Sequence, residues 1–477
     1  MIALLTLTAW SADLVVEALA SELMRTSELR LPEAAAPYFV AYDFRDGEEY
    51  EVEASLGAIV REDSGPNREL GIAVHVGSEE MDNTNFNHRD QGDGIRRISL
   101  PFGEVPDAVR QAAWLGSDIS YKDAVTNFSS KQAARRNQLE QSRPNDFAPG
   151  EPHVAAVPPG QAQDQGALAA IARTLSAEFL AWPEIESSRV YVGAEWGRRV
   201  LLDTIGTRVQ KPLGTVAIRV SASTRSSGGE EIWDHASWTV RTFDQLPSVD
   251  VLRHDLGRMA ERLGAWRSAA KDEKGYAGPV VFMGDAAIEV VRQLLVPALV
   301  GTPPEEVTKD ALGGSETKIG GMRLNRRVLP PGFAAFDDPT ADPGLPSAYA
   351  FDDEGVPAMQ IDLVEDGVVR GLYASRVPGQ DVPQSNGHGR GTTGSMIRGA
   401  PSWLHVEADR PGTEAKLMKV GMKLAAEYGL DHVLVVRRLA DPKLGPDAFL
   451  ARYSASKEGR TDLSAPIEAV RHYADGR

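Results

Sequence analysis

The spacing of hydrophobic positions along the chain predicts a mixture of helices and strands. Several stretches carry apolar side chains three and four residues apart, which is the period of an amphipathic helix. These helical stretches are residues 13–25, 105–115, 120–140, 164–181, 248–267, 285–300 and 413–428. Runs rich in β-branched and aromatic residues predict strands, at residues 37–43, 50–62, 69–77, 190–192, 199–203, 207–210, 215–222, 238–243, 279–283, 333–336, 348–351, 360–365, 368–372 and 432–437. The predicted fold class is therefore α+β.

Polar turns and linkers divide these elements into regions. We predict an N-terminal α+β domain, a helix with an antiparallel sheet, over residues 13–141 and a β-rich middle segment over 164–274. Residues 142–163 between them are rich in proline and poor in apolar side chains, which predicts an exposed linker. A large β-rich C-terminal domain is predicted over residues 275–477. Within the β-rich parts, polar turns are expected to separate strands at residues 45–48, 64–67 and 195–197.

The two ends of the chain leave its localisation open between the cytoplasm and the periplasm or exterior. Residues 1–12 are apolar, and the first basic residue is Arg25. They are either the frayed start of a helix or the remnant of a secretory signal. At the other end, Asp475-Gly476 resembles a hairpin turn without a return strand. The two interpretations are that the natural protein continues past Arg477, which we expect, or that these residues are a frayed tail.

Composition excludes several functions. The formal net charge is −17, and an acidic surface repels phosphate backbones, so general nucleic-acid binding is not expected. The chain has no cysteine, which excludes disulfides, thiolate catalysis and cysteine-based metal sites. No apolar run reaches the roughly 20 residues that span a bilayer, so no membrane-spanning segment is predicted.

A strand–turn–helix unit at residues 278–304 is the most informative stretch. Residues 279–283 predict a short strand, and a tight turn follows. Asp285 is expected to cap the next helix because its carboxylate can accept amide hydrogens of the first turn. Pro297 is expected to kink or end that helix, since proline has no backbone N–H.

This unit resembles the start of the C-terminal domain in the TldD/TldE (PmbA) family of bacterial metalloprotease-related proteins. The TldD branch carries H-E-x-x-x-H on this helix, in which two histidines bind a metal and the glutamate acts as general base. Here Arg292, Gln293 and Pro297 stand at those three positions. Arginine and proline offer no lone pair to a metal, and glutamine cannot accept a proton. The chain is therefore similar to the TldE branch, which lacks its own metal site.

Other motifs of the C-terminal region carry the same resemblance. They are the acidic turn 352–355, the hairpin 365–372, the glycine-rich loop 386–390 and the segment 401–404, in which Trp403 stands where the family more often has asparagine. The resemblance implies a large TldD/PmbA-type domain and a non-catalytic subunit in the proteolysis of unfolded peptides. It also implies a partner, either a TldD-like subunit that supplies the zinc or a second copy in a homodimer.

Two further groups of residues are candidates for binding. Asn386, His388 and Arg390 lie in a glycine-rich loop that lets a ligand approach closely, and an arginine suits a peptide carboxylate. They are the predicted peptide-binding residues. Asp352, Asp353 and Glu354 are most simply an acidic β-turn, although hard oxygen ligands of this kind also suit Mg²⁺ or Ca²⁺. Ser385 beside His388 makes no serine-hydrolase arrangement, because their proximity in sequence fixes no geometry.

Two alternatives to the non-catalytic subunit therefore stay open. The chain could be an active metallopeptidase whose ligands have moved elsewhere, with His388 and His405 the first candidates. It could instead be a secreted or periplasmic peptide-binding protein without enzymatic activity.

Overall fold

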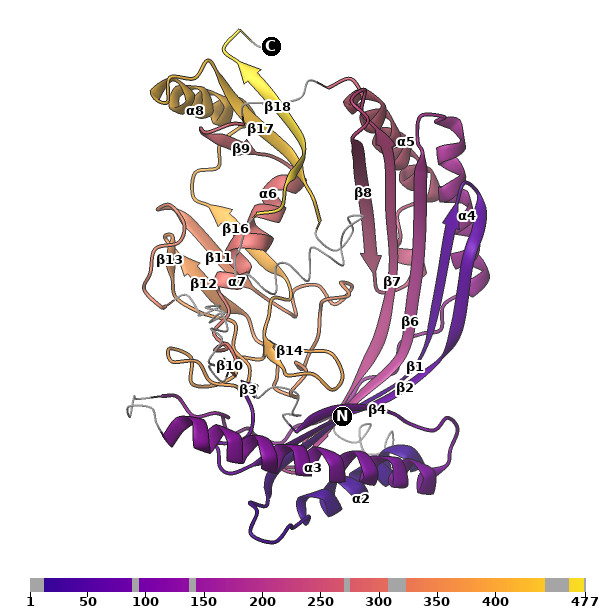
Figure 1. Ribbon diagram of the computed structural model, residues 1–477, viewed down its shortest axis with the longest axis vertical. Coiled ribbons are helices and arrows are strands. Elements are labelled where there is room, and N and C mark those ends of the chain that lie inside the picture. The colour runs from indigo at the N-terminus through magenta and orange to yellow at the C-terminus, as the bar shows by residue number, and fades with distance from the viewer. Residues whose placement is uncertain are drawn as a thin grey trace.

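The computed structural model describes residues 13–87, 94–136, 143–269, 275–307, 323–441 and 463–475. A long curved sheet with helices on it forms one side of the molecule, and the C-terminal region, with smaller sheets, faces it (Figure 1). The helices are α2 (Leu14–Ser27), α3 (Pro106–Arg136), α4 (Gln165–Ala177), α5 (Val249–Trp266), α6 (Asp285–Val290), α7 (Val296–Ala298) and α8 (Glu414–Glu427). The α+β fold class is confirmed, since helices and mainly antiparallel sheets occur together.

The long sheet contains seven strands in the order β4-β2-β1-β6-β7-β5, with β8 also paired to β7. Their bounds are β1 (Pro37–Ser55), β2 (Ala58–Val76), β4 (Ile95–Ser99), β5 (Val154–Ala156), β6 (Ser187–Asp203), β7 (Arg208–Arg225) and β8 (Glu231–Val240). Strand β1 from the predicted N-terminal domain pairs with β6 from the predicted middle segment, from Ala41↔Asp203 to Ala54↔Val190. These two predicted regions therefore share a single sheet.

The strands are longer than the sequence predicted, and the expected turns at 45–48, 64–67 and 195–197 are wrong. All three stretches lie inside β1, β2 and β6. Their polar residues remain in the sheet because they pair across strands: Asp46 on β1 bonds Arg68 on β2 at 2.7 Å and Arg198 on β6 at 3.2 Å. The actual turn between β1 and β2 is Leu56-Gly57, where both residues have positive φ.

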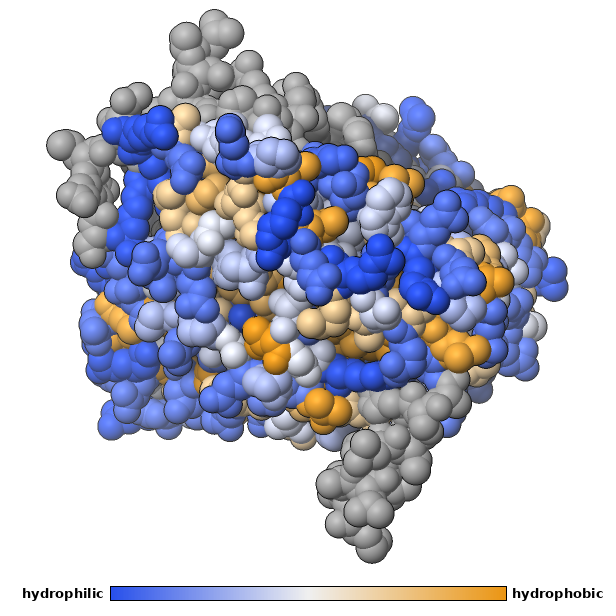
Figure 2. Space-filling view, turned by 90° about the horizontal axis from the view of Figure 1, so that it is seen from below, coloured by the Kyte–Doolittle hydropathy of each residue, from blue (hydrophilic) through white to orange (hydrophobic). Residues whose placement is uncertain are grey.

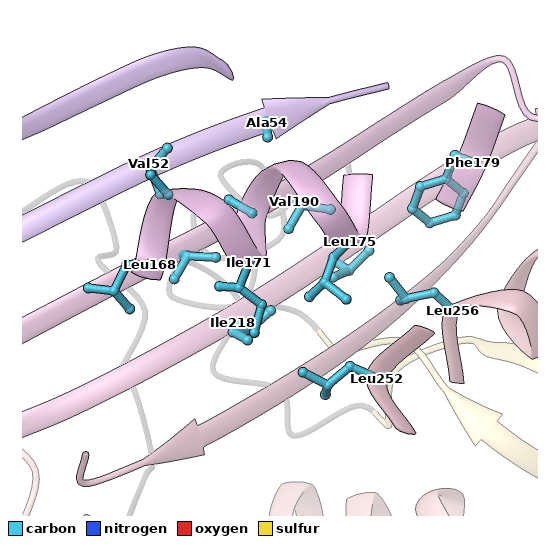
Figure 3. Packing of buried hydrophobic residues seen from close by; sticks show 14 of the residues in the cluster. Val52, Ala54, Leu168, Ile171, Leu175, Phe179, Val190, Ile218, Leu252 and Leu256 are labelled. Atoms are coloured by element: carbon cyan, nitrogen blue, oxygen red, sulfur yellow. The ribbon is translucent and has the colours of Figure 1, made fainter. Parts of the chain in front are cut away.

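Two hydrophobic clusters hold helices against the sheet. Near one end, α4 and α5 pack on β1, β6 and β7 through side chains such as Leu168, Leu175 and Leu252 (Figure 3). Near the other end, α2 and α3 pack on β1 and β2. Helix α3 is continuous where two helices were predicted, at 105–115 and 120–140. Gly116 lies in the middle of α3, where the helix packs closely on β2. A Cβ added at Gly116 would come within 2.6 Å of the Ile72 side chain.

The described part of the predicted linker, residues 143–163, is mostly exposed, but two short stretches of it pack or pair with the rest of the chain. Phe147 and Ala148 are buried, and residues 154–156 form β5, which pairs in parallel with β7. The N-cap role of Asp164 on α4 is confirmed, since its carboxylate accepts the amide of Ala167. Seen from the side of α2 and α3, the surface is mostly hydrophilic, with hydrophobic side chains in small groups (Figure 2).

The C-terminal region contains several small sheets. The strands are β9 (Val280–Phe282), β10 (Glu306–Val307), β11 (Phe333–Asp337), β12 (Ile361–Glu365), β13 (Val368–Val369), β14 (Gly389–Arg390), β15 (Arg398–Gly399), β16 (Leu404–Ala408), β17 (His432–Leu439) and β18 (Pro466–Tyr473). Strand β10 pairs with β3 (Phe86–Asn87) of the N-terminal part. The predicted Asp366-Gly367 hairpin is confirmed between β12 and β13. Within the described ranges, every helix is too short or too polar to cross a lipid bilayer.

Candidate functional site

The helix at 285–298 begins differently from the prediction. Gly284, with φ of 55°, is its N-cap, and no side chain caps the first turn. The prediction that Asp285 caps the helix is wrong, because Asp285 is the first helical residue. Its carboxylate instead accepts a hydrogen bond from Arg438 at 3.0 Å, which ties the helix to β17.

A π-helical turn, Val291–Leu295, interrupts this helix where the family motif would lie. The amide of Val296 donates to the carbonyl of Val291, five residues earlier. In a regular α-helix, residues five apart point about 140° from each other, because each residue turns about 100°. A π turn brings such residues close to one face. The π turn therefore brings positions 292 and 297 closer to one face of the helix, which is the arrangement that two metal ligands five residues apart would need.

The side chains at the motif positions are occupied by other interactions. Arg292 forms a bidentate pair with Glu289, at 2.9 and 2.6 Å, and hydrogen bonding to Glu289 raises its pKa. Gln293 donates to Glu289 at 2.7 Å and accepts the amide of Ser464 at 2.8 Å. A cationic guanidinium, an engaged amide and a proline do not fit a zinc ion, so these three positions support no metal-dependent catalytic step.

The structure places the predicted peptide-binding residues in a tightly bonded loop. Asn386 accepts the amide of Ala374 at 3.1 Å and donates to the carbonyl of Leu372 at 2.8 Å. His388 is fully buried, and its Nε2 lies 3.4 Å from the Asp337 carboxylate. These two side chains therefore hold the loop and do not face outward as a peptide site requires.

Arg390 is partly exposed, as Asn386 is, but among the described residues its guanidinium does not serve to hold the loop backbone. Its side chain is 33% exposed and lies 3.3 Å from the carboxylate of Asp353. Its guanidinium stacks over the ring of Tyr349, with 4.3 Å to the centroid. A role of Arg390 in binding a peptide stays a prediction.

The acidic turn predicted at 352–354 is present, with Asp352 and Asp353 buried and Glu354 partly buried. Asp352 is 0% and Asp353 4% exposed. Asp353 lies 2.6 Å from Lys211 on β7 and 2.8 Å from Arg199 on β6. Burial alone would raise the pKa of Asp353, but these two cations hold it well below its usual range. The turn thus joins the C-terminal region to the long sheet through buried charges.

A cavity of about 100 Å³ lies beside this turn, between the long sheet and the C-terminal loops. Phe39, Phe147 and Arg376 line one part of it. The guanidinium of Arg376 lies over both rings, at 4.6 Å from the centroid of Phe39 and 4.2 Å from that of Phe147. Glu354 also lines the cavity and accepts the amide of Arg376 at 2.6 Å.

Asp352 and Glu354 share this buried environment but differ in their hydrogen bonds. Asp352 accepts the amides of Glu354, Val356 and Gly389 at 2.9 Å each. Such donors favour an ionised carboxylate. Burial, followed by the charge of Asp352, raises the pKa of Glu354 to about 8. We therefore assign the proton of this pair to Glu354 at neutral pH.

A Glu354→Gln variant is expected to remove a pH dependence of stability. The folded state keeps a proton on Glu354 at pH values where the unfolded chain has released it, because the pKa of Glu354 is higher in the folded state. This group therefore stabilises the fold at low pH. Its contribution is lost as the pH rises toward about 8. Melting temperatures at pH 5.5, 7 and 8.5 should fall more steeply for the wild type than for the variant. The exposed Glu427→Gln serves as control. Parallel pH profiles for all three proteins would contradict the assignment.

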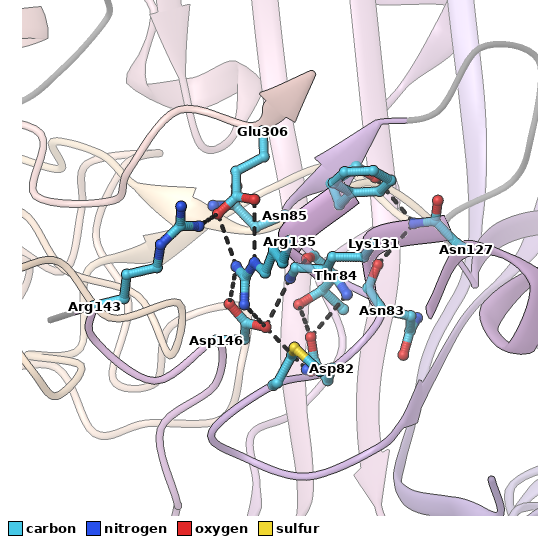
Figure 4. A network of polar contacts seen from close by, with 12 residues as sticks. Asp82, Asn83, Thr84, Asn85, Asn127, Lys131, Arg135, Arg143, Asp146 and Glu306 are labelled. Atoms are coloured by element: carbon cyan, nitrogen blue, oxygen red, sulfur yellow. Dashed lines mark hydrogen bonds and ion pairs between the residues drawn. The ribbon is translucent and has the colours of Figure 1, made fainter. Parts of the chain in front are cut away.

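A second polar network joins α3, the 143–148 segment and β10 (Figure 4). Asp146 accepts hydrogen bonds from Lys131 at 2.7 Å and from Arg135 at 3.0 Å. Arg135 also bonds Glu306 on β10 at 2.7 Å. Lys131 is fully buried, whereas the Arg135 and Glu306 side chains are 17% and 31% exposed. The network therefore holds the C-terminal region against α3 through charges that range from buried to partly exposed.

The residues named for a relocated metal site lie apart. His388 is bonded inside the domain, whereas His405 is half-exposed and lies 3.7 Å from Glu407. Among the described residues, no three histidine, aspartate or glutamate side chains are grouped so that they could hold a metal ion. The acidic turn is instead neutralised by Lys211 and Arg199.

Comparison with known proteins agrees with this architecture. Residues 276–433 match the family model described as the PmbA/TldA metallopeptidase C-terminal domain. A metalloprotease from Synechocystis sp. is 47% identical over 55 residues, and this match spans 12% of the chain and 12% of that relative.

Solved structures extend the similarity to most of the chain. TldE from Thermococcus kodakarensis superposes with a TM-score of 0.56 at 14% identity, covering 90% of this chain and 83% of that one. A proposed modulator of DNA gyrase from Bacteroides thetaiotaomicron gives 0.54 at 11% identity, covering 89% and 82%. A similar protein from Thermotoga maritima gives 0.52 at 14% identity, covering 85% and 80%. At these identities, the structures establish the fold alone.

Residues 276–433 thus form a C-terminal domain of the PmbA/TldA metallopeptidase class. The family resemblance expected from the sequence is confirmed over this domain.

Proposed function

We propose that this chain is a non-catalytic, TldE-like subunit that acts with a metal-bearing TldD-like subunit on unfolded peptides. The single observation that carries the proposal concerns the helix at 285–298, which we call the motif helix because it holds the three positions of the family's metal motif. It is the combination of this helix's backbone conformation and side-chain contacts. The π turn at Val291–Leu295 is present, but Arg292 and Gln293 are held by Glu289 and Ser464. A subunit with this helix contributes structure and surface, and zinc and its general base come from the partner.

Metal analysis of the purified chain tests the absence of a catalytic centre. We expect inductively coupled plasma mass spectrometry to find transition metal far below one equivalent, and no chelator-sensitive cleavage of an unfolded peptide. The physical reason is that Arg292 places a permanent positive charge at the position of a metal ligand. Near-stoichiometric zinc together with chelator-sensitive cleavage would favour the alternative of an active metallopeptidase with relocated ligands.

Co-expression with a TldD-like subunit tests the assembly. We expect the two chains to elute together on size-exclusion chromatography and to cleave an unfolded peptide in a chelator-sensitive manner. A mixture in which the metal-bearing subunit carries His→Ala changes at its own metal ligands is the control and should be inactive. Separate elution of the two chains, with full activity in the TldD-like fraction alone, would contradict an obligatory partnership.

A further inference from the structure

An aromatic cluster lies on the β11–β16 pair, away from the motif helix. Phe336 on β11 is directly opposite His405 on β16, and their ring centroids are 4.9 Å apart. Trp403 lies 6.4 Å from Phe336 and 5.8 Å from His405. We call Phe336, Trp403 and His405 the aromatic platform. It includes the tryptophan at the position where the family more often has asparagine.

The platform occupies the face of the sheet opposite to the hydrophobic core. Successive strand residues point to opposite faces, and the neighbours Ala335, Leu404 and Val406 belong to the core cluster on the other side. Trp403 is 37% exposed and the side chain of His405 is 43% exposed. The rings are therefore accessible from outside.

Carboxylates surround the platform on the same face. Asp362 on β12 is directly opposite Phe336 and is exposed. Glu407, two residues after His405, has a side chain that is 59% exposed. Asp338 lies just beyond the end of β11 and next to Trp403, since its amide donates to the Trp403 carbonyl at 3.3 Å; its carboxylate accepts hydrogen bonds from the amide and hydroxyl of Thr340. Aromatic ring faces with three carboxylates around them form a surface of negative potential.

We propose that the aromatic platform binds an arginine side chain of an extended peptide. A planar guanidinium stacks on aromatic rings and at the same time donates to carboxylates, which is the combination that this surface offers. The charge complementarity with Asp338, Asp362 and Glu407 selects a cation over an apolar side chain. The inference rests on the proposed role in handling unfolded peptides, and it gives that role a preference for basic residues.

Fluorescence anisotropy with the full chain tests this inference. The probes are two fluorescein-labelled unstructured peptides of identical sequence, one with arginine and one with the neutral isostere citrulline at the same positions. Titrations at pH 8, where an ordinary imidazole is uncharged, contain a chelator so that cleavage cannot contribute. We expect the arginine peptide to bind about tenfold more tightly than the citrulline peptide, as a stacked and paired cation warrants.

Variants separate the platform from the general acidity of the chain. Trp403→Gln and Asp362→Asn/Glu407→Gln should each remove most of the preference for arginine, while Trp403→Phe should retain it. Trp114→Gln is the matched control, because Trp114 is 44% exposed on α3, at a distant site. Equal binding of the two peptides, or an equal loss in Trp114→Gln, would overturn the proposal. Both outcomes leave the metal analysis unaffected, so the two proposals can fail separately.

Discussion

Replacing Asp353 by asparagine is expected to lower the free energy of unfolding by about 3–5 kcal/mol, because the Lys211 ammonium loses its carboxylate partner and Arg199 is left with Asp43 alone. Asp353 is 4% exposed and is the carboxylate nearest to Lys211, at 2.6 Å. It also pairs with Arg199 and accepts the amide of Gly391 at 3.0 Å. An asparagine at position 353 would have no negative charge to pair with Lys211 and Arg199. Chemical denaturation of the wild type and the variant measures the difference.

Two further variants identify the cause of that loss. Asp63→Asn removes a surface carboxylate whose side chain is 69% exposed, and it should change stability by less than about 1 kcal/mol. Lys211→Met in the Asp353→Asn background should recover part of the stability, because the unpaired ammonium is then gone. A loss below about 1 kcal/mol in Asp353→Asn would show that water reaches this cluster and compensates the cations.

The second large effect is expected for Asp146→Ala. This change removes the carboxylate that accepts hydrogen bonds from Lys131, Arg135 and the amide of Asp82. Lys131 is fully buried, and burial already lowers its pKa. We expect a loss of about 3–5 kcal/mol because an ammonium group is left without a contacting carboxylate. Thermal and chemical unfolding of the purified variant check this value.

The double variant Asp146→Ala/Lys131→Met decides whether the unpaired charge is responsible. It should be more stable than Asp146→Ala alone, since both partners of the pair are then absent. Asp118→Ala, which removes an i,i+4 pair with the exposed Lys122 on the same helix, is the control and should cost about 0.5 kcal/mol. Equal stability of the single and double variants would point to lost hydrogen bonds instead of the unpaired ammonium.

Local patterns predicted those features that depend on neighbours in sequence. The helical period of apolar residues correctly predicted α4 and α5. The predictions of Asp164 as a helix cap and of Asp366-Gly367 as a hairpin turn were also correct. The predicted turns inside β1, β2 and β6 were wrong because polar residues there interact across strands: Asp46 and Glu195 form ion pairs, and Asn67 donates a hydrogen bond to Glu49. A sequence pattern gives no sign of a partner such as Arg198, which lies 152 positions from Asp46.

The candidate functional residues also fall into those that the sequence alone could interpret and those whose surroundings depend on distant segments. The sequence identified Arg292, Gln293 and Pro297 as departures from a metal motif, since the loss of ligand atoms follows from residue type alone. It interpreted 352–354 as a simple turn, because the cations that neutralise Asp353 come from β6 and β7, more than a hundred residues earlier. Acidic residues of this kind are normally placed in water unless such partners are known.

The sequence by itself determined the mixture of helices and strands and the unsuitability of Arg292, Gln293 and Pro297 for binding zinc. These follow from local periodicity and from the chemistry of individual side chains. Only the tertiary structure decided that one sheet runs through residues 37–240, that His388 is buried, and that Phe336, Trp403 and His405 form one exposed surface. Such features depend on contacts between distant segments, whose energies arise only when the chain has folded.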